Sequence, residues 1–145
     1  MQAMPEVDPD NESTFHVCVV KSDLKACRVP KDRILRELEK HQFSEEATFA
    51  IKLALEEALC NAVKHGNQDD PGKSVTVRYA VTAEKAVVVV CDEGEGFEPD
   101  SGPDPTTDDR LAIPNGRGIM LIAAYMDEVA YRDNGREIYF MKRRQ

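Results

Sequence analysis

Residues 44–66 read SEEATFAIKLALEEALCNAVKHG, and this stretch decides the fold. Ser44 is a suitable N-cap, and Glu45 and Glu46 follow in the first turn, where the helix dipole favours negative charge. No helix breaker occurs before Gly66, so we predict one long helix that stops at this glycine. Its apolar stripe is wide and must pack against something large, such as a sheet. The stripe consists of Phe49, Ile51, Leu53, Leu55, Ala58, Leu59, Ala62 and Val63.

Shorter apolar segments on both sides of this helix predict a sheet and two further helices. The predicted elements are an edge strand at 15–20, a helix at 30–41, strands at 75–81 and 87–91, a helix at 119–126, and hairpin strands at 129–132 and 138–141 around Asp133-Asn134-Gly135. Residues 97–115 hold four prolines and five acidic residues without periodicity, which predicts a lid.

This order of elements predicts an α+β fold, a two-layer sandwich with helices packed on one face of a mixed, mostly antiparallel β-sheet. The run at 87–91 is almost entirely β-branched, so we expect that strand to be buried on both faces or nearly so. We expect one domain over residues 14–145, preceded by a disordered leader at 1–13.

The composition excludes several classes of protein. Hydrophobic residues make up 41% of the chain and charged residues 32%, as in an ordinary globular protein. The net charge of −8 argues against broad attraction to nucleic acid, because phosphate neutralisation needs a cationic face. The four cysteines form no CxxC pair, which favours reduced thiols and a cytoplasmic location. The acidic leader is unlike a signal peptide, and no apolar run approaches the roughly 20 residues of a membrane span.

Glu57 and Asn61 lie four residues apart, so both side chains project from the same face of the long helix. Lys64 and His65 follow one turn later. One interpretation of these polar groups is a solvated helix face. The other is chemical, because the Asn61 carbonyl oxygen suits a hard cation such as Mg²⁺ and Glu57 can accept a proton from a nucleophile.

Two glycine-rich segments add candidate ligand contacts. Asp92-Glu93-Gly94-Glu95-Gly96 follows the buried strand, where its glycines let the backbone approach a flat ligand and Asp92 can accept a hydrogen bond from an exocyclic amine such as that of adenine. Asn115-Gly116-Arg117-Gly118-Ile119 stands at a helix start, where free backbone amides suit a phosphate and Arg117 adds a cation. Taken alone, each segment also fits an ordinary turn between elements.

The order and spacing of these three segments resemble the GHKL ATPases, the superfamily of gyrase and the histidine kinases. Residues 57–66 resemble its N box, residues 92–96 its G1 box and residues 116–118 its G2 box. The stretches His65-Gly66-Asn67 and Met126-Asp127-Glu128-Val129, and the absence of a phosphoacceptor-histidine helix pair, resemble the bacterial anti-sigma factors that act as serine/threonine protein kinases. The fold that this resemblance implies is the Bergerat ATP-binding fold.

The resemblance also implies ATP and Mg²⁺ as cofactors and gives several residues a role. Asn61 is then the ligand of Mg²⁺, Glu57 the candidate catalytic base, and Asp92 the residue that reads adenine. The other implied nucleotide contacts are Lys64, Gly94, Gly96, Gly116, Arg117 and Gly118, the last three facing the phosphates.

The leading hypothesis is phosphoryl transfer from ATP to a serine or threonine of an anti-anti-sigma (STAS-type) protein, by a chain that also binds a sigma factor. The alternative is a non-catalytic module in which ATP orders the lid and presents a surface that sequesters a sigma factor or another regulator. A third interpretation is an α+β domain without a nucleotide site. We expect no direct contact with nucleic acid or membrane, and the resemblance suggests a homodimer.

Overall fold

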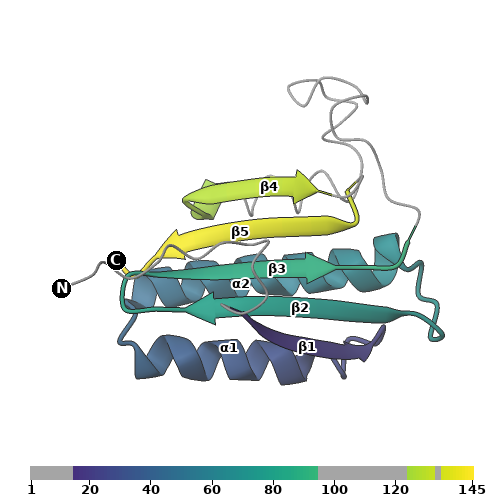
Figure 1. The fold of residues 1–145 in the computed structure, drawn as a ribbon, viewed down its shortest axis with the longest axis horizontal. Helices are drawn as coiled ribbons and strands as arrows, with labels where there is room; N and C mark the ends of the chain where they lie inside the picture. The colour runs from purple at the N-terminus through teal and green to yellow at the C-terminus, as the bar shows by residue number, and fades with distance from the viewer. Residues whose placement is uncertain (1–14, 95–123, 133–134) are drawn as a thin grey trace.

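The computed structural model describes residues 15–94, 124–132 and 135–145. The elements in chain order are β1 (His16–Lys21), α1 (Arg28–Lys40), α2 (Glu45–Asn61), η2 (Ala62–Gly66), β2 (Ser74–Val81), β3 (Lys85–Cys91), β4 (Glu128–Arg132) and β5 (Glu137–Arg143) (Figure 1). The strands and helices predicted within these ranges are present, with ends that differ by one or two residues.

Some predictions lie outside the described residues, namely the leader at 1–13, the lid at 97–115 and the first part of the helix at 119–126. Of that helix, Ala124 and Tyr125 are described and are helical, and Met126 after them is buried. In the portions of the chain that are described, no helix is both long and apolar enough to cross a membrane.

The five strands form one open sheet in the order β1-β2-β3-β5-β4. All four pairings among the described strands are antiparallel. β3 is central, and β1 lies at an edge, as predicted for residues 15–20. The two helices α1 and α2 cover one face of the sheet (Figure 1). The molecule is therefore the two-layer α+β sandwich predicted from the sequence.

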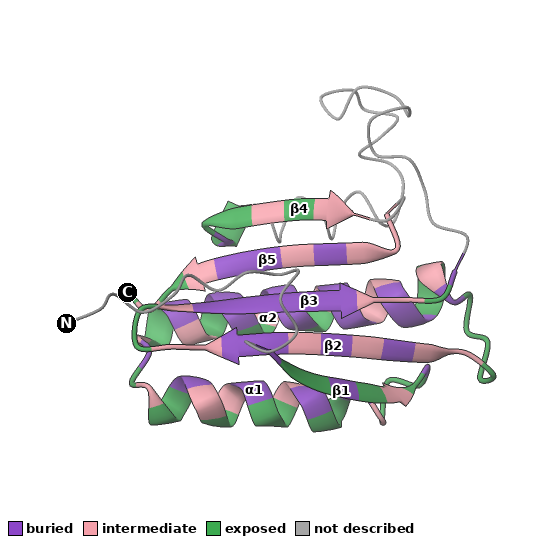
Figure 2. Cartoon of the chain, viewed as in Figure 1, coloured by how far each residue is buried: buried purple, intermediate pink, exposed green. Residues whose placement is uncertain are grey.

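The central strand β3 is buried on both faces, as its β-branched run predicts. Val88 and Val90 belong to the core cluster beneath the two helices, while Val87 and Val89 belong to a second cluster on the outer face of the sheet. Figure 2 shows the contrast between β3, which is buried along most of its length, and the edge strands β1 and β4. The end of β3 is thus held rigidly, and the segment that follows it starts from a fixed position.

The helix α2 begins as predicted, but it ends differently. Ser44 Oγ accepts a hydrogen bond from Ala47 N (3.0 Å), which caps the first turn. The last turn, η2, is wound as a π-helix, with Asn67 N donating to Ala62 O (2.8 Å). The prediction that the helix stops at Gly66 is confirmed, and left-handed backbone follows at Gln68 (φ 52°) and Asp69 (φ 58°).

The outer face of the sheet carries a largely buried ion-pair cluster. Glu137 of β5 pairs through one carboxylate oxygen with Arg78 Nη2 of β2 (2.7 Å) and through the other with Arg132 Nε of β4 (3.1 Å). The Arg78 and Glu137 side chains are only 15% and 14% exposed. Cys91 Sγ donates to Glu137 Oε1 (3.3 Å), and burial, together with this hydrogen bond, raises the pKa of Cys91 to about 12.

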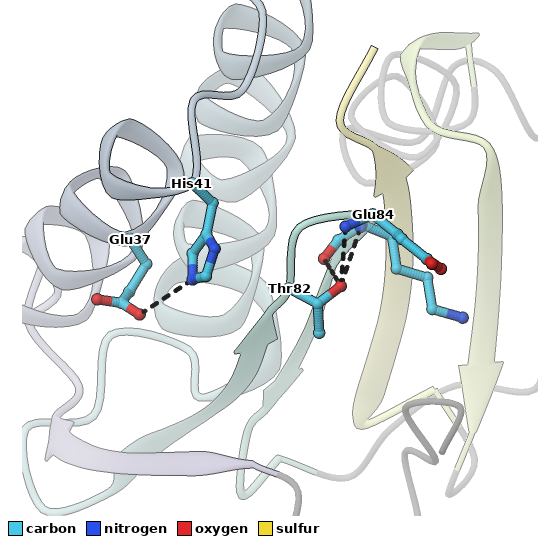
Figure 3. A network of polar contacts seen from close by, with 5 residues as sticks. Glu37, His41, Thr82 and Glu84 are labelled. Atoms are coloured by element: carbon cyan, nitrogen blue, oxygen red, sulfur yellow. Dashed lines mark hydrogen bonds and ion pairs between the residues drawn. The ribbon is translucent and has the colours of Figure 1, made fainter. Parts of the chain in front are cut away.

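At the opposite end of β3, a threonine stabilises the turn from β2. The Thr82 hydroxyl donates to Lys85 O (3.2 Å) and accepts from the amides of Glu84 and Lys85 (3.2 Å each). Figure 3 shows this turn beside the C-terminal end of α1, where His41 Nε2 lies 4.0 Å from Glu37 Oε1. The turn fixes the start of β3, as a hydrogen-bonded tight turn does.

Candidate functional site

The end of the long helix and the turn after β3 are in contact through two glycines. A Cβ added to Gly66 would overlap the Asp92 carboxylate, at 2.8 Å from Oδ1 and closer still to Cγ and Oδ2. A Cβ added to Gly94 would overlap the Gly66 carbonyl, at 2.6 Å from its carbon and closer to its oxygen. A side chain at Gly94 would meet backbone, and one at Gly66 would need the Asp92 carboxylate to move, so the structure brings the predicted N box and the start of the predicted G1 box into close contact.

This contact gives Gly66 a role in addition to the predicted helix stop. A side chain at residue 66 would meet the Asp92 carboxylate, which would have to move to make room for it. Gly94 is in close contact with the Gly66 backbone. The approach of this turn to a flat ligand stays a prediction.

Asn67 is the polar centre of this contact and is fully buried, with 0% of its surface exposed. Its amide nitrogen donates to Ser22 Oγ (2.9 Å) and to Ser74 O (3.0 Å), and its Oδ1 accepts from Glu93 N (2.8 Å). These bonds join the end of β1, the start of β2 and the turn after β3 to the end of η2. Asn67 therefore links four segments that are far apart in the sequence.

The other side of the turn is held by Arg136, at the start of β5. Asp92 N donates to Arg136 O (2.9 Å), and Arg136 Nε donates to Gly94 O (2.8 Å). Within the turn, Gly94 N donates to Asp92 Oδ1 (2.8 Å). Glu93 adds a bond on the side of β2, where its carboxylate accepts from Ser74 N (2.6 Å). Residues 92–94 thus form a turn whose backbone is fixed from both sides.

The sequence reasoning missed Asn67 and Arg136 as structural determinants of this site. In the sequence, Asn67 appears as the last residue of the stretch His65-Gly66-Asn67 that carries the family resemblance. The one local indication of a structural role is that a polar residue directly follows the helix stop. Arg136 carries no local signal, because its partners Asp92 and Gly94 are more than 40 residues away in the chain. Only the folded arrangement reveals either contact.

The predicted helix-face residues lie just before this contact. Glu57 and Asn61 are on α2 and are partly buried, whereas Lys64 and His65 of η2 are exposed. Asn61 is the last residue of α2, where the π-helical turn begins. Within residues 15–94, 124–132 and 135–145, no three His, Cys, Asp or Glu side chains cluster as metal ligands.

Four of the predicted site residues, Gly96, Gly116, Arg117 and Gly118, lie outside the described residues. Of the predicted site, the structure therefore shows one contact within the described ranges, in which Gly66 lies against Asp92 and Gly94. In this part, the Asp92 carboxylate can accept more than one hydrogen bond, including one from an exocyclic amine.

The fold and this contact define a class of protein. Residues 21–142 match the family described as the histidine kinase-like ATPase domain, which spans most of the chain and nearly all of the described sandwich. The chain belongs to this family, as its resemblance to the GHKL ATPases implied.

Within the family, the chain is similar to proteins named serine-protein kinase RsbW. It is 34% identical to the one from Listeria monocytogenes serovar 1/2a over 107 residues, which is 69% of this chain and 68% of that protein. It is 35% identical to the one from Bacillus subtilis over 91 residues, 58% of this chain and 56% of that protein, and 36% identical to the one from Bacillus velezensis over the same shares. The match to the Bacillus proteins thus spans just over half of their length.

Proposed function

We propose that this chain binds ATP and transfers its γ-phosphoryl group to a serine or threonine of a small regulatory protein. In this role it is a cytoplasmic anti-sigma factor, and its partners are a sigma factor and a STAS-type anti-anti-sigma protein. The observation that carries the proposal is the contact of Gly66 with Asp92 and Gly94, which joins the segments that resemble the N box and the G1 box of the GHKL ATPases.

Each end of the nucleotide has a proposed set of partners. The Asp92 carboxylate accepts a hydrogen bond from the exocyclic amine of adenine, beside Gly94 and Gly96. Asn61 is the proposed Mg²⁺ ligand. The proposed partners of the phosphates are Lys64, Gly116, Arg117 and Gly118. Magnesium, when bound, would neutralise charge on the phosphates, and the residues named here would orient the nucleotide.

Catalysis is favoured over simple binding by two observations. The relatives in Listeria and Bacillus carry the name of a serine-protein kinase. Glu57 is partly buried and lies one helical turn before Asn61, where a carboxylate can accept the proton of an attacking hydroxyl. A module that only binds ATP has no need of an acid at this position.

The test compares two neighbouring glutamates. Titration calorimetry first measures the Kd of ATP with and without Mg²⁺, and single-turnover assays then follow transfer from radiolabelled ATP to a purified anti-anti-sigma protein. We expect Glu57→Gln to slow transfer by about a hundredfold or more, because loss of a general base has this effect, and to change the Kd of ATP little. The matched control is Glu56→Gln, whose carboxylate is exposed and pairs with Lys31 at 3.5 Å.

The outcomes separate the candidate functions. ATP binding followed by formation of phosphoserine or phosphothreonine supports the kinase. Tight ATP binding without transfer by the unsubstituted chain would indicate the non-catalytic binding module. Absence of ATP binding would remove both, and equal rates in Glu57→Gln and Glu56→Gln would remove the role of Glu57.

A further inference from the structure

We propose that Asn67 is a positioning residue that sets the selectivity of this site for adenine by holding the Asp92 turn in place. The inference rests on the proposed ATP binding and extends it to a residue that does not touch the nucleotide. Asn67 acts through the peptide that joins Asp92 to Glu93, because its Oδ1 accepts the hydrogen bond of Glu93 N at 2.8 Å.

The hydrogen-bonding capacity of Asn67 is used on both sides. The two N–H groups of its amide have acceptors in Ser22 Oγ and Ser74 O, and its oxygen has a donor in Glu93 N. Asn67 is 0% exposed, so bulk water does not compete for its amide in the folded chain. Removal of the amide takes a partner away from the Glu93 amide and from the Ser74 carbonyl, and the turn loses these bonds to the helix end.

Among the described residues, two other sets of hydrogen bonds restrain the turn, one of them exposed to water and the other on the side of the turn that faces Arg136. The bond from Ser74 N to the Glu93 carboxylate is exposed, so water competes with it. The bonds to Arg136 hold the opposite side of the turn. Asn67 is thus a buried restraint between the turn and the helix end, and its loss should let the turn that carries Asp92 shift relative to Gly66.

This arrangement predicts an effect on one part of the ligand. Displacement of Asp92 weakens the hydrogen bond to the exocyclic amine of adenine, whereas the proposed phosphate contacts come from Lys64 and residues 116–118. A ligand that lacks the amine should therefore be insensitive to Asn67. General loosening of the fold would instead weaken both ligands equally, so the ratio of the two affinities distinguishes positioning from a structural role.

The experiment measures by calorimetry the Kd of ATP and of purine riboside triphosphate, which lacks the 6-amino group. In the unsubstituted chain we expect ATP to bind about tenfold or more tightly than the analogue, as a hydrogen bond to a charged group implies. In Asn67→Ala we expect the ratio to fall to about one, as in the reference variant Asp92→Ala, whose side chain accepts no hydrogen bond, with the Kd of the analogue nearly unchanged. Ile34→Val is the matched control, because it loosens the α1 core and should leave the ratio intact.

Asn67→Ser is the second variant, which tests the same role if Asn67→Ala does not fold. Its hydroxyl satisfies one buried group but is one bond too short to take the place of Oδ1, so the same fall in ratio is expected. Retention of the full ratio in a folded variant, or equal weakening of both ligands, would overturn the role of Asn67 while leaving ATP binding intact. Absence of ATP binding by the unsubstituted chain would refute the proposed function itself, and the positioning role with it.

Discussion

Substitution of Gly94 by alanine tests the central contact of the site most directly. The added Cβ would meet the Gly66 carbonyl, which belongs to the backbone and cannot rotate away as a flexible side chain can. The turn at 92–94 must therefore move away from the helix end. Movement breaks or stretches the bonds from Glu93 N to Asn67 Oδ1 and from Arg136 Nε to Gly94 O.

The size of the effect follows from these contacts. Overpacking contributes about 1–3 kcal/mol, and each of the two hydrogen bonds about 1 kcal/mol. We expect Gly94→Ala to lower the free energy of unfolding by about 3–5 kcal/mol in urea titrations. For a chain of this size, the melting temperature should fall by about 10–15 °C. ATP binding should be lost as well, because Asp92 moves with the turn.

Gly72→Ala is the control for this prediction. A Cβ at Gly72 would meet only the Asp70 carboxylate, at 3.2 Å, on an exposed turn. Its free energy of unfolding should lie within about 0.5 kcal/mol of the unsubstituted chain. A Gly94→Ala variant that is as stable as Gly72→Ala and still binds ATP would refute the close packing of the two segments.

Two further predictions concern the sheet and its thiols. Glu137→Gln should lower the free energy of unfolding by about 2 kcal/mol in urea titrations, because it leaves the largely buried Arg78 guanidinium without its counter-charge. The control is the exposed Glu56→Gln, which should change the free energy of unfolding by less than about 0.5 kcal/mol. Equal effects of the two substitutions would contradict the burial of the cluster. Burial raises the pKa of Cys27 to about 11 and that of Cys91 to about 12, from 9.0 in each case, so both stay neutral at pH 8.5. Alkylation of Cys27 by iodoacetamide, followed by mass spectrometry, should then be about a hundredfold slower in the folded chain than in urea. The free energy of unfolding should also decline as the pH rises above 9, because only the thiols of the unfolded chain ionise there.

Much of the fold could be predicted from local patterns. The N-cap at Ser44 and the β-branched run of β3 depend on neighbouring residues alone, and both predictions are confirmed. The hairpin of β4 and β5 is confirmed as well, with Gly135 in the left-handed region (φ 82°). These features are local in origin, so the order of residues is sufficient to indicate them.

The contacts that hold the candidate site could not be predicted in this way. Asn67 bonds to Ser22, 45 residues earlier in the chain, and Arg78 bonds to Glu137 across the intervening strand β3. Such partners become neighbours only when the sheet order is set. The family resemblance implied which segments meet in the site, but not the hydrogen bonds that hold them, and the roles of Glu57, Asn61 and Asp92 stay predictions.

The valine run of β3 has a consequence for how the sheet aligns. A shift of one residue along β2 and β5 would exchange Val88 and Val90 for Val87 and Val89 beneath the helices, and valine would still be buried on both faces. The apolar pattern alone therefore does not fix the register of β3 against its neighbours. Correct alignment must come from the polar ends of the strand, the Thr82 turn before it and the bonded Asp92 turn after it, so the residues that hold the Asp92 turn also fix the position at which the central strand ends.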